Sequence, residues 1–196
     1  MEPQLAKRIV SGLREAGINF VAYLPESRLS QILPLMRKDP FFQLVGVGIG
    51  LALALPHRRV VVLESDGSVL LSLFNLPTLA RLHPANLAVF VFDNGVYSGS
   101  RISEPTATAG RTDLEKIAKS AGIRQATTIR NIRAFKKDGL AALKKKGLRF
   151  IVCKVEESLV HRKIPRPTID LAENKYRFVR YLERTEGKAI PFVGRG

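Results

Sequence analysis

Apolar and polar residues form two kinds of pattern along this chain, one with helical spacing and one continuously apolar, and segments of the two kinds alternate. Leu5, Ile9 and Leu13 recur at helical spacing and predict a first helix that ends near Gly17. The segments 60–64 and 87–92, VVVLE and LAVFVF, are instead apolar at almost every position. Such runs are typical of strands that are buried on both faces, as in a parallel sheet covered by helices.

The other segments continue this alternation of strands and helices. Further strands are predicted at 19–24, 41–45, 126–129 and 149–155, and 59–64 is the third strand in chain order. Helices are predicted at 27–36, 68–82, 112–122 and 173–185, with a short one ended by Pro56 and a lysine-rich one before 149. Thr112 and Glu115 have the spacing of a capping box. We therefore predict an α/β fold: a doubly wound, mostly parallel sheet with helices on both faces.

The charge of the chain narrows the classes of partner. The 196 residues carry a formal net charge of +15, which attracts anions. The densest basic stretch, 130–149, contains Phe135 as its only aromatic residue and no motif of known docking geometry, so we interpret it as a solvated helix face. We do not expect nucleic acid as a partner. No apolar run has the length of a membrane span, and the first residues lack a signal peptide, so we expect a soluble, cytoplasmic protein without a membrane partner.

The single cysteine, Cys153, lies in the apolar run FIVCKV. No partner motif for catalysis or metal binding accompanies it. We interpret it as a buried thiol of the core.

Glycines recur at positions 46, 48 and 50, after the predicted strand FFQLV. This spacing resembles a dinucleotide-binding fingerprint, and Glu64 lies about where a ribose-binding acid is expected. The fingerprint requires a third glycine at position 51, which is Leu51. A tight turn with close helix packing explains these glycines better than a nicotinamide site does.

A second glycine-bearing turn follows the strand 59–64. Asp66 supplies a carboxylate there, and Asn94 supplies an amide oxygen at the end of the next predicted strand. Ligands bind at the carboxyl ends of strands in such sheets, and magnesium prefers a few oxygen ligands together with phosphate oxygens. A carbonyl in the turn 95–96 is a third candidate ligand.

The residues next to Asp66 suit a diphosphate. Gly67 allows close approach of the backbone, and N–H groups at the start of the helix from Ser68 attract negative charge. The alternative is that Asp66 is a helix N-cap and 93–95 an ordinary turn. For either turn alone, that alternative is the simpler one.

Taken together, the two turns resemble the pyrophosphate-binding domain of thiamine diphosphate enzymes, and most of all the sulfopyruvate and phosphonopyruvate decarboxylases. The family motif is Gly-Asp-Gly-Ser, followed after about two dozen to thirty residues by Asn or Asp-Asn. The resemblance runs from about Gly46 to the end of the chain, through GIGLALALP, SDGSVLLSLFNLPTLA, PANLAVFVFDNGVYSGS and EPTATAGRTDLEKIAKSAGI.

The resemblance implies a role for each matching residue. Asp66 and Asn94 would bind Mg²⁺ through their side chains and Val96 through its carbonyl. The cofactor thiamine diphosphate would be held by these residues together with the rest of the motif, Ser65, Gly67 and Ser68. No residue is assigned a catalytic role, and Tyr97, Ser98, Ser100 and Arg101 are either surface residues or face the reacting end.

Two departures from the family pattern concern the site. Ser65 stands where the family has its first glycine. Enzymes of this kind also have a pyrimidine-binding domain, whose glutamate hydrogen-bonds the cofactor ring. Residues 1–45 resemble only the opening of that domain, and Glu26 is not at the matching position. We therefore divide the chain into this segment, a pyrophosphate-binding domain at 46–160, and a linker with a helix at 161–196.

Two hypotheses of function follow. The first is a thiamine diphosphate- and Mg²⁺-binding subunit of a decarboxylase for small anionic 2-oxo acids. Its catalysis would require an oligomer, formed with further copies or with a pyrimidine-binding subunit. The second is a non-catalytic protein of the same fold that binds a partner or an anionic polymer. Ser65, the absence of the matching glutamate and the net charge of +15 favour the second, and the pair Asp66 and Asn94 favours the first.

Overall fold

The computed structural model describes residues 3–23, 32–37, 39, 43–45, 48–97, 104–156 and 171–190. The chain divides into two compact units, Met1–Ile164 and Pro165–Gly196. The first unit contains the sheet and all of the predicted site residues.

A six-stranded sheet organises the first unit. The strand order is β2-β1-β3-β4-β8-β7, and each neighbouring pair is parallel. The strands are β1 (Phe20–Tyr23), β2 (Gln43–Val45), β3 (Val60–Ser65), β4 (Leu87–Asp93), β7 (Ala126–Ile129) and β8 (Arg149–Lys154). The predicted strands are all present, with ends that agree to within two residues. The predicted α/β class is confirmed.

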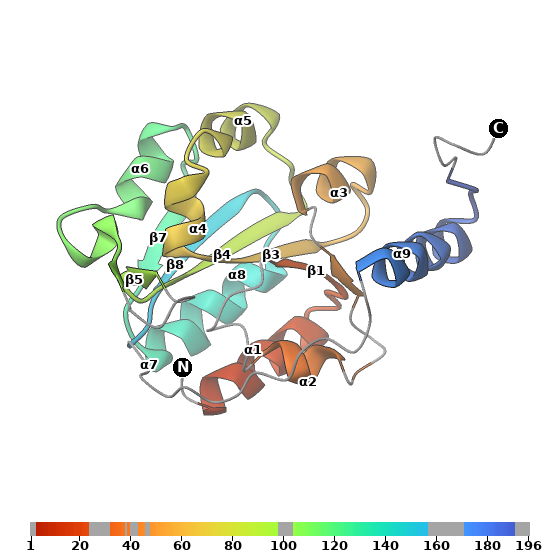
Figure 1. The fold of residues 1–196 in the computed structure, drawn as a ribbon, viewed down its shortest axis with the longest axis horizontal. Coiled ribbons are helices and arrows are strands. Elements are labelled where there is room, and N and C mark those ends of the chain that lie inside the picture. Colours follow the sequence, from red (N-terminus) through yellow and green to blue (C-terminus); the bar gives the residue numbers. More distant parts are fainter. Residues whose placement is uncertain are drawn as a thin grey trace. The chain divides into compact units, whose positions relative to one another are not determined.

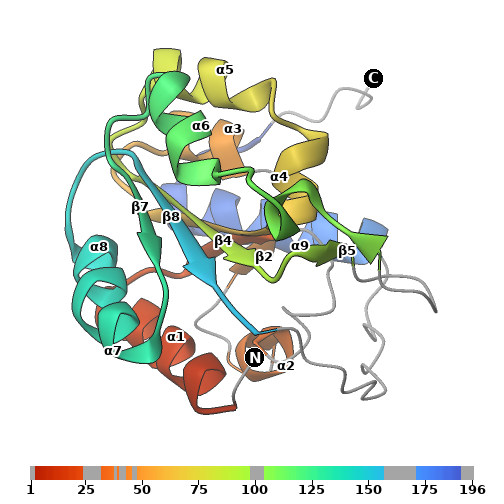
Figure 2. The ribbon, with the colours of Figure 1, turned by 90° about the vertical axis from the view of Figure 1, so that its left-hand side faces the viewer.

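Helices cover both faces of this sheet (Figure 1 and Figure 2). One face carries α1 (Pro3–Glu15), α2 (Leu33–Arg37), α7 (Ile132–Ala134) and α8 (Leu140–Lys144), the last two joined by a π-helical segment, Phe135–Gly139. The other face carries α3 (Gly48–Ala54), α4 (Asp66–Leu71), α5 (Asn75–Leu82) and α6 (Leu114–Ser120). The lysines of the basic stretch, Lys136, Lys137 and Lys144 to Lys146, are exposed, as expected of a solvated face.

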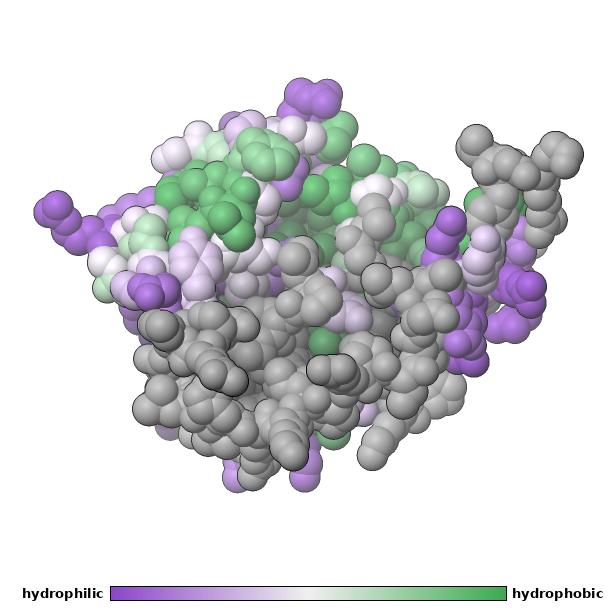
Figure 3. All heavy atoms as spheres, viewed as in Figure 1, coloured by the Kyte–Doolittle hydropathy of each residue, from purple (hydrophilic) through white to green (hydrophobic). Residues whose placement is uncertain are grey.

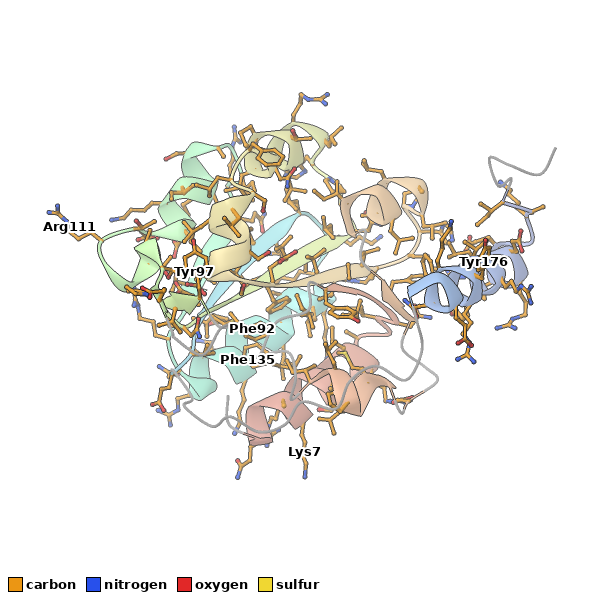
Figure 4. All side chains as sticks on the ribbon, in the orientation of Figure 1. Lys7, Phe92, Tyr97, Arg111, Phe135 and Tyr176 are labelled. Atoms are coloured by element: carbon orange, nitrogen blue, oxygen red, sulfur yellow. The ribbon has the colours of Figure 1, made fainter. Side chains whose placement is uncertain are left out.

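The central strand β4 fixes the position of the site. All seven of its residues are buried. Phe90 meets Phe135 edge to face, with the ring centroids 6.2 Å apart, and Phe92 lies on the same side of the sheet (Figure 4). At the start of the strand, Nδ2 of Asn86 contacts three backbone carbonyl oxygens, those of Ala52, Leu55 and Arg58, at 2.7–3.0 Å. Both ends of β4 are therefore held by packing and hydrogen bonds.

The helix predicted at 68–82 is in fact two helices, α4 and α5, separated by turn residues at 72–74. Pro77 in the first turn of α5 explains the break. A proline has no N–H to donate to the residue four positions earlier, and its ring clashes with that carbonyl, so it disfavours a continuous helix through Leu73. Pro77 is tolerated where it lies because the N–H groups of a first turn have no partner within the helix.

Two smaller differences concern turns near the site. The N-cap of α6 is Asp113, whose side chain accepts a hydrogen bond from the N–H of Lys116, and not the predicted Thr112. The sequence did not predict the short antiparallel pair β5 (Val96–Tyr97) and β6 (Glu104–Pro105). Both strands have only two residues, which is too short for a periodic signal.

The second unit contains α9 (Leu171–Glu186), close to the helix predicted at 173–185. Glu173 and Arg177, one turn apart, form an ion pair at 2.8 Å. Within the described ranges, no helix has both the length and the apolar character that crossing a membrane requires.

Cys153 of β8 is buried, as predicted, and burial raises the pKa of its thiol to about 12. Because the thiolate is the reactive form, we expect Cys153 of the native protein at about pH 8 to react with a thiol reagent only as fast as the fold opens around it. The same reagent with urea-unfolded protein provides the reference rate. Native protein that reacts as fast as the unfolded chain would contradict the burial of this thiol.

Candidate functional site

The carboxyl ends of β3 and β4 lie side by side. Ser65 pairs with Phe92 in the parallel register, so the residues that follow each strand emerge at the same edge of the sheet. Asp66 follows β3 directly, and Asn94 follows β4. The two side chains predicted to act together therefore start from neighbouring strand ends, the usual ligand-binding edge of such a sheet.

Asp66 has a fully buried side chain at the first position of α4. Its Oδ2 accepts hydrogen bonds from the hydroxyls of Thr106, at 2.6 Å, and Thr108, at 2.7 Å. The N-cap of α4 is Ser65, so the alternative that Asp66 is merely an N-cap is wrong.

Sequence reasoning missed both threonines. They belong to the stretch EPTATAG, which contributed only to the family resemblance, and they lie 40 and 42 positions beyond Asp66. Two hydroxyls spaced as Thr-x-Thr beside a candidate metal ligand are a weak signal. Only the fold brings them to the carboxylate.

The donors of Ser68 are used within the chain. Its N–H donates to Oγ of Ser65 at 3.2 Å, and its hydroxyl donates to Oε2 of Glu64 at 2.5 Å. Burial raises the pKa of the half-buried Glu64, and the hydrogen bond from Ser68 opposes this rise. A diphosphate that contacts Ser68 would thus compete with Ser65 and Glu64 for these donors.

Gly67 has no space for a side chain. A Cβ at this position would lie 2.6 Å from two ring carbons of Tyr97, far inside van der Waals contact. Tyr97 comes from β5 and lies beside α4 (Figure 4). A side chain at position 67 would therefore displace the Tyr97 ring, a contact that the sequence alone did not indicate.

The turn after β4 is built around Gly95, whose φ of +74° favours glycine. Oδ1 of Asn94 accepts a hydrogen bond from the N–H of Val96 at 3.4 Å. The carbonyl of Gly95 accepts from the N–H of Thr106 at 2.9 Å, and Val96 pairs with Pro105 in the β5–β6 ladder. The turn is thus attached to the same segment that binds Asp66.

A buried acid next to this turn was not predicted. Asp93, the last residue of β4, is 2% exposed, and its Oδ2 pairs with Nζ of Lys154 at 2.6 Å. Its Oδ1 is buried and accepts no hydrogen bond from the described residues. This edge of the sheet therefore has more oxygen acceptors than the described protein donors satisfy.

The oxygen atoms gathered here suit a hard cation. Asp66 offers a carboxylate, Asn94 an amide oxygen and Val96 a backbone carbonyl, the ligand types that Mg²⁺ accepts together with phosphate and water. Within the described ranges, no group of three His, Cys, Asp or Glu side chains forms a metal site. A site completed by the phosphates of a cofactor fits this donor set better than one made of protein side chains alone.

The glycine-rich turn before α3 and the remaining residues singled out in the sequence have different outcomes. A Cβ on Gly48, at the start of α3, would overlap the side chain of Val62, so close helix–strand packing explains this glycine, as interpreted. Gly46, Glu26 and three residues named after the metal turn, Ser98, Ser100 and Arg101, lie outside the described residues.

Comparisons with known proteins identify the family of this chain. The family "thiamine pyrophosphate enzyme, C-terminal TPP binding domain" matches residues 43–153, more than half of the chain. Sulfopyruvate decarboxylase subunit beta of Methanocaldococcus jannaschii is 32% identical over 76% of this chain and 80% of its own length. Phosphonopyruvate decarboxylase of Streptomyces viridochromogenes is 38% identical over 44% of this chain and 23% of its own length.

A solved structure supports the fold. It is described as that of a thiamin diphosphate-dependent enzyme from Mycobacterium smegmatis, and it superimposes with a TM-score of 0.54 at 20% identity. The match covers 76% of this chain and 31% of the other. The resemblance expected from the sequence is confirmed: the chain belongs to the thiamine pyrophosphate enzymes and carries their C-terminal TPP-binding domain.

Proposed function

We propose that this chain is the thiamine diphosphate- and Mg²⁺-binding subunit of a cytoplasmic decarboxylase for small anionic 2-oxo acids. The observation that carries the proposal is the buried Asp66 carboxylate, held at the end of β3 beside the Asn94 turn, in a chain of this family. The substrate class is that named by the relatives, sulfopyruvate and phosphonopyruvate.

Each residue of the site has a role in this proposal. Asp66, Asn94 and the carbonyl of Val96 would hold Mg²⁺, whose charge would offset that of the diphosphate. The backbone of Gly67 and Ser68, together with Ser65, would hold the diphosphate. When bound, thiamine diphosphate supplies the nucleophile and the electron sink for loss of carbon dioxide from a 2-oxo acid. The chain itself anchors and orients the cofactor, and its charge of +15 attracts the anionic substrate.

We further propose that a partner subunit supplies the pyrimidine-binding domain and its glutamate. Three matching relatives are named as beta subunits, and in phosphonopyruvate decarboxylase the matching region is a minor part of a longer chain. Leu71, at the end of α4, and Phe74, in the next turn, are 76% and 74% exposed, and apolar atoms gather over α4 (Figure 3). A protein that covered these side chains would also lie next to the helix that begins at Asp66.

Asp66→Asn keeps an oxygen that can accept from both threonines but removes the charge that binds the cation. We expect calorimetric titration to show Mg²⁺-dependent binding of thiamine diphosphate to the wild type, and binding at least about 100-fold weaker in the variant. Asp113→Asn, at the N-cap of α6, is the matched control and should bind as the wild type does. Binding that ignores Mg²⁺ and falls steeply with salt would instead favour the non-catalytic alternative.

Ser65→Gly restores the family residue and releases the N–H of Ser68 from its intramolecular acceptor. We expect thiamine diphosphate to bind about three- to tenfold more tightly, the worth of one hydrogen bond, at a cost in stability of only a few tenths of a kcal/mol. Ser65→Ala separates the two effects of the serine, because it removes the hydroxyl and keeps Cβ. Unchanged affinity in both variants would show that the cap does not oppose cofactor binding.

The need for a partner glutamate has its own test. NMR can follow exchange of the thiazolium C2 proton of thiamine diphosphate into deuterium oxide. If the glutamate comes from another subunit, the saturated chain alone should exchange this proton no faster than free cofactor does, although it binds the cofactor. Accelerated exchange by the purified chain would contradict the need for a partner.

A further inference from the structure

The segment Glu104–Gly110, EPTATAG, is attached to both parts of the proposed cation site. It supplies the two hydroxyls that bind Asp66, and it supplies the strand and N–H group that hold the Asn94 turn. Thr106 and Thr108 are, apart from Asp66 and Asp93, the buried polar side chains of the described residues. Buried polar groups are costly unless they are paired, so their arrangement is specific.

The hydroxyls and the carboxylate form a triangle of oxygen atoms. Both hydroxyls donate to Oδ2 of Asp66, and their own oxygens lie 2.8 Å apart. Because both donors act on the same oxygen, they restrict rotation of the carboxylate and thereby set the direction of Oδ1. Hydrogen bonds to a carboxylate are short and stronger than those between neutral groups, which suits this task.

Thr106 connects the two ligand segments directly. Its side chain donates to Asp66, and its backbone N–H donates to the carbonyl of Gly95 at 2.9 Å, between Asn94 and Val96. Ala109 of the same segment packs against Gly95: a Cβ added to Gly95 would lie 3.4 Å from the Cα of Ala109. A shift of this segment would therefore move the carboxylate and the turn together.

We propose that Thr106 and Thr108 are positioning residues for the cation: they hold Asp66 in the orientation, and at the separation from the Asn94 turn, that metal binding requires. This inference rests on the proposed function. Groups that orient a metal ligand without touching the metal typically change its affinity 10- to 100-fold. A merely structural pair of threonines would change the stability of the fold and leave the affinity for the cation as it was.

Valine has nearly the shape of threonine and lacks the hydroxyl, so Thr106→Val and Thr108→Val remove one donor each. The backbone N–H of Thr106 is retained in its variant. Thr106→Ser and Thr108→Ser keep the donors, and Thr127→Val, at an exposed position of β7, controls for the substitution itself. Thr108→Ala, which preserves the contacts of Thr106, is the milder variant for the case in which the valine variants do not fold.

Two measurements are made on each purified chain. Calorimetry gives the Kd of thiamine diphosphate at fixed, subsaturating Mg²⁺, and urea unfolding gives the stability with EDTA and with Mg²⁺ and cofactor. We expect each valine variant, or Thr108→Ala in their place, to bind about tenfold more weakly and to gain less stability from the ligands. The serine variants should remain within about twofold of the wild type, and Thr127→Val should be unchanged.

The outcomes distinguish this inference from the proposed function. If the hydroxyl-free variants lose stability in EDTA but keep wild-type affinity, the threonines are structural and the inference is overturned, while the proposed function stands. If the wild-type chain shows no Mg²⁺-dependent binding, the proposed function fails and this inference with it. Weaker binding that the serine variants restore supports both.

Discussion

The burial of one carboxylate, that of Asp66, is the constraint on which the site depends. A charged group taken out of water is costly unless hydrogen bonds replace its hydration. The fold meets this requirement with hydroxyls from Thr106 and Thr108, which arrive from 40 and 42 positions along the chain. The β5–β6 pair places them there, so a two-residue ladder has a consequence much larger than its size suggests.

The parallel register of β3 and β4 supplies the second requirement. It sets Ser65 beside Phe92, and therefore brings the residues after both strands to one edge. All seven residues of β4 are buried, so the strand that leads into Asn94 is held inside the core between the two helical layers. Site geometry and core packing are thus two results of the same strand pairing.

Much of this could be predicted from the sequence, for identifiable reasons. The strands 60–64 and 87–92 are apolar almost throughout, so their burial and parallel pairing followed from composition. Their ends drew attention to Asp66 and Asn94, and the family resemblance paired these two residues as metal ligands, a role that stays a prediction. Pro77 indicates a break in the predicted helix 68–82, but the apolar pattern continues across that range and favoured one continuous helix. Thr106, Thr108 and the contact of Tyr97 with Gly67 could not be predicted, because they depend on a hairpin too short to leave a periodic signal.

The most direct test of the account is the position of the cation itself. Crystals of the chain grown with Mn²⁺ in place of Mg²⁺ and with thiamine diphosphate would locate the metal by its anomalous scattering. The account predicts a peak coordinated by the carboxylate of Asp66, the amide oxygen of Asn94, the carbonyl of Val96 and oxygens of the diphosphate. Bound cofactor with the manganese elsewhere, or no manganese beside Asp66, would contradict it.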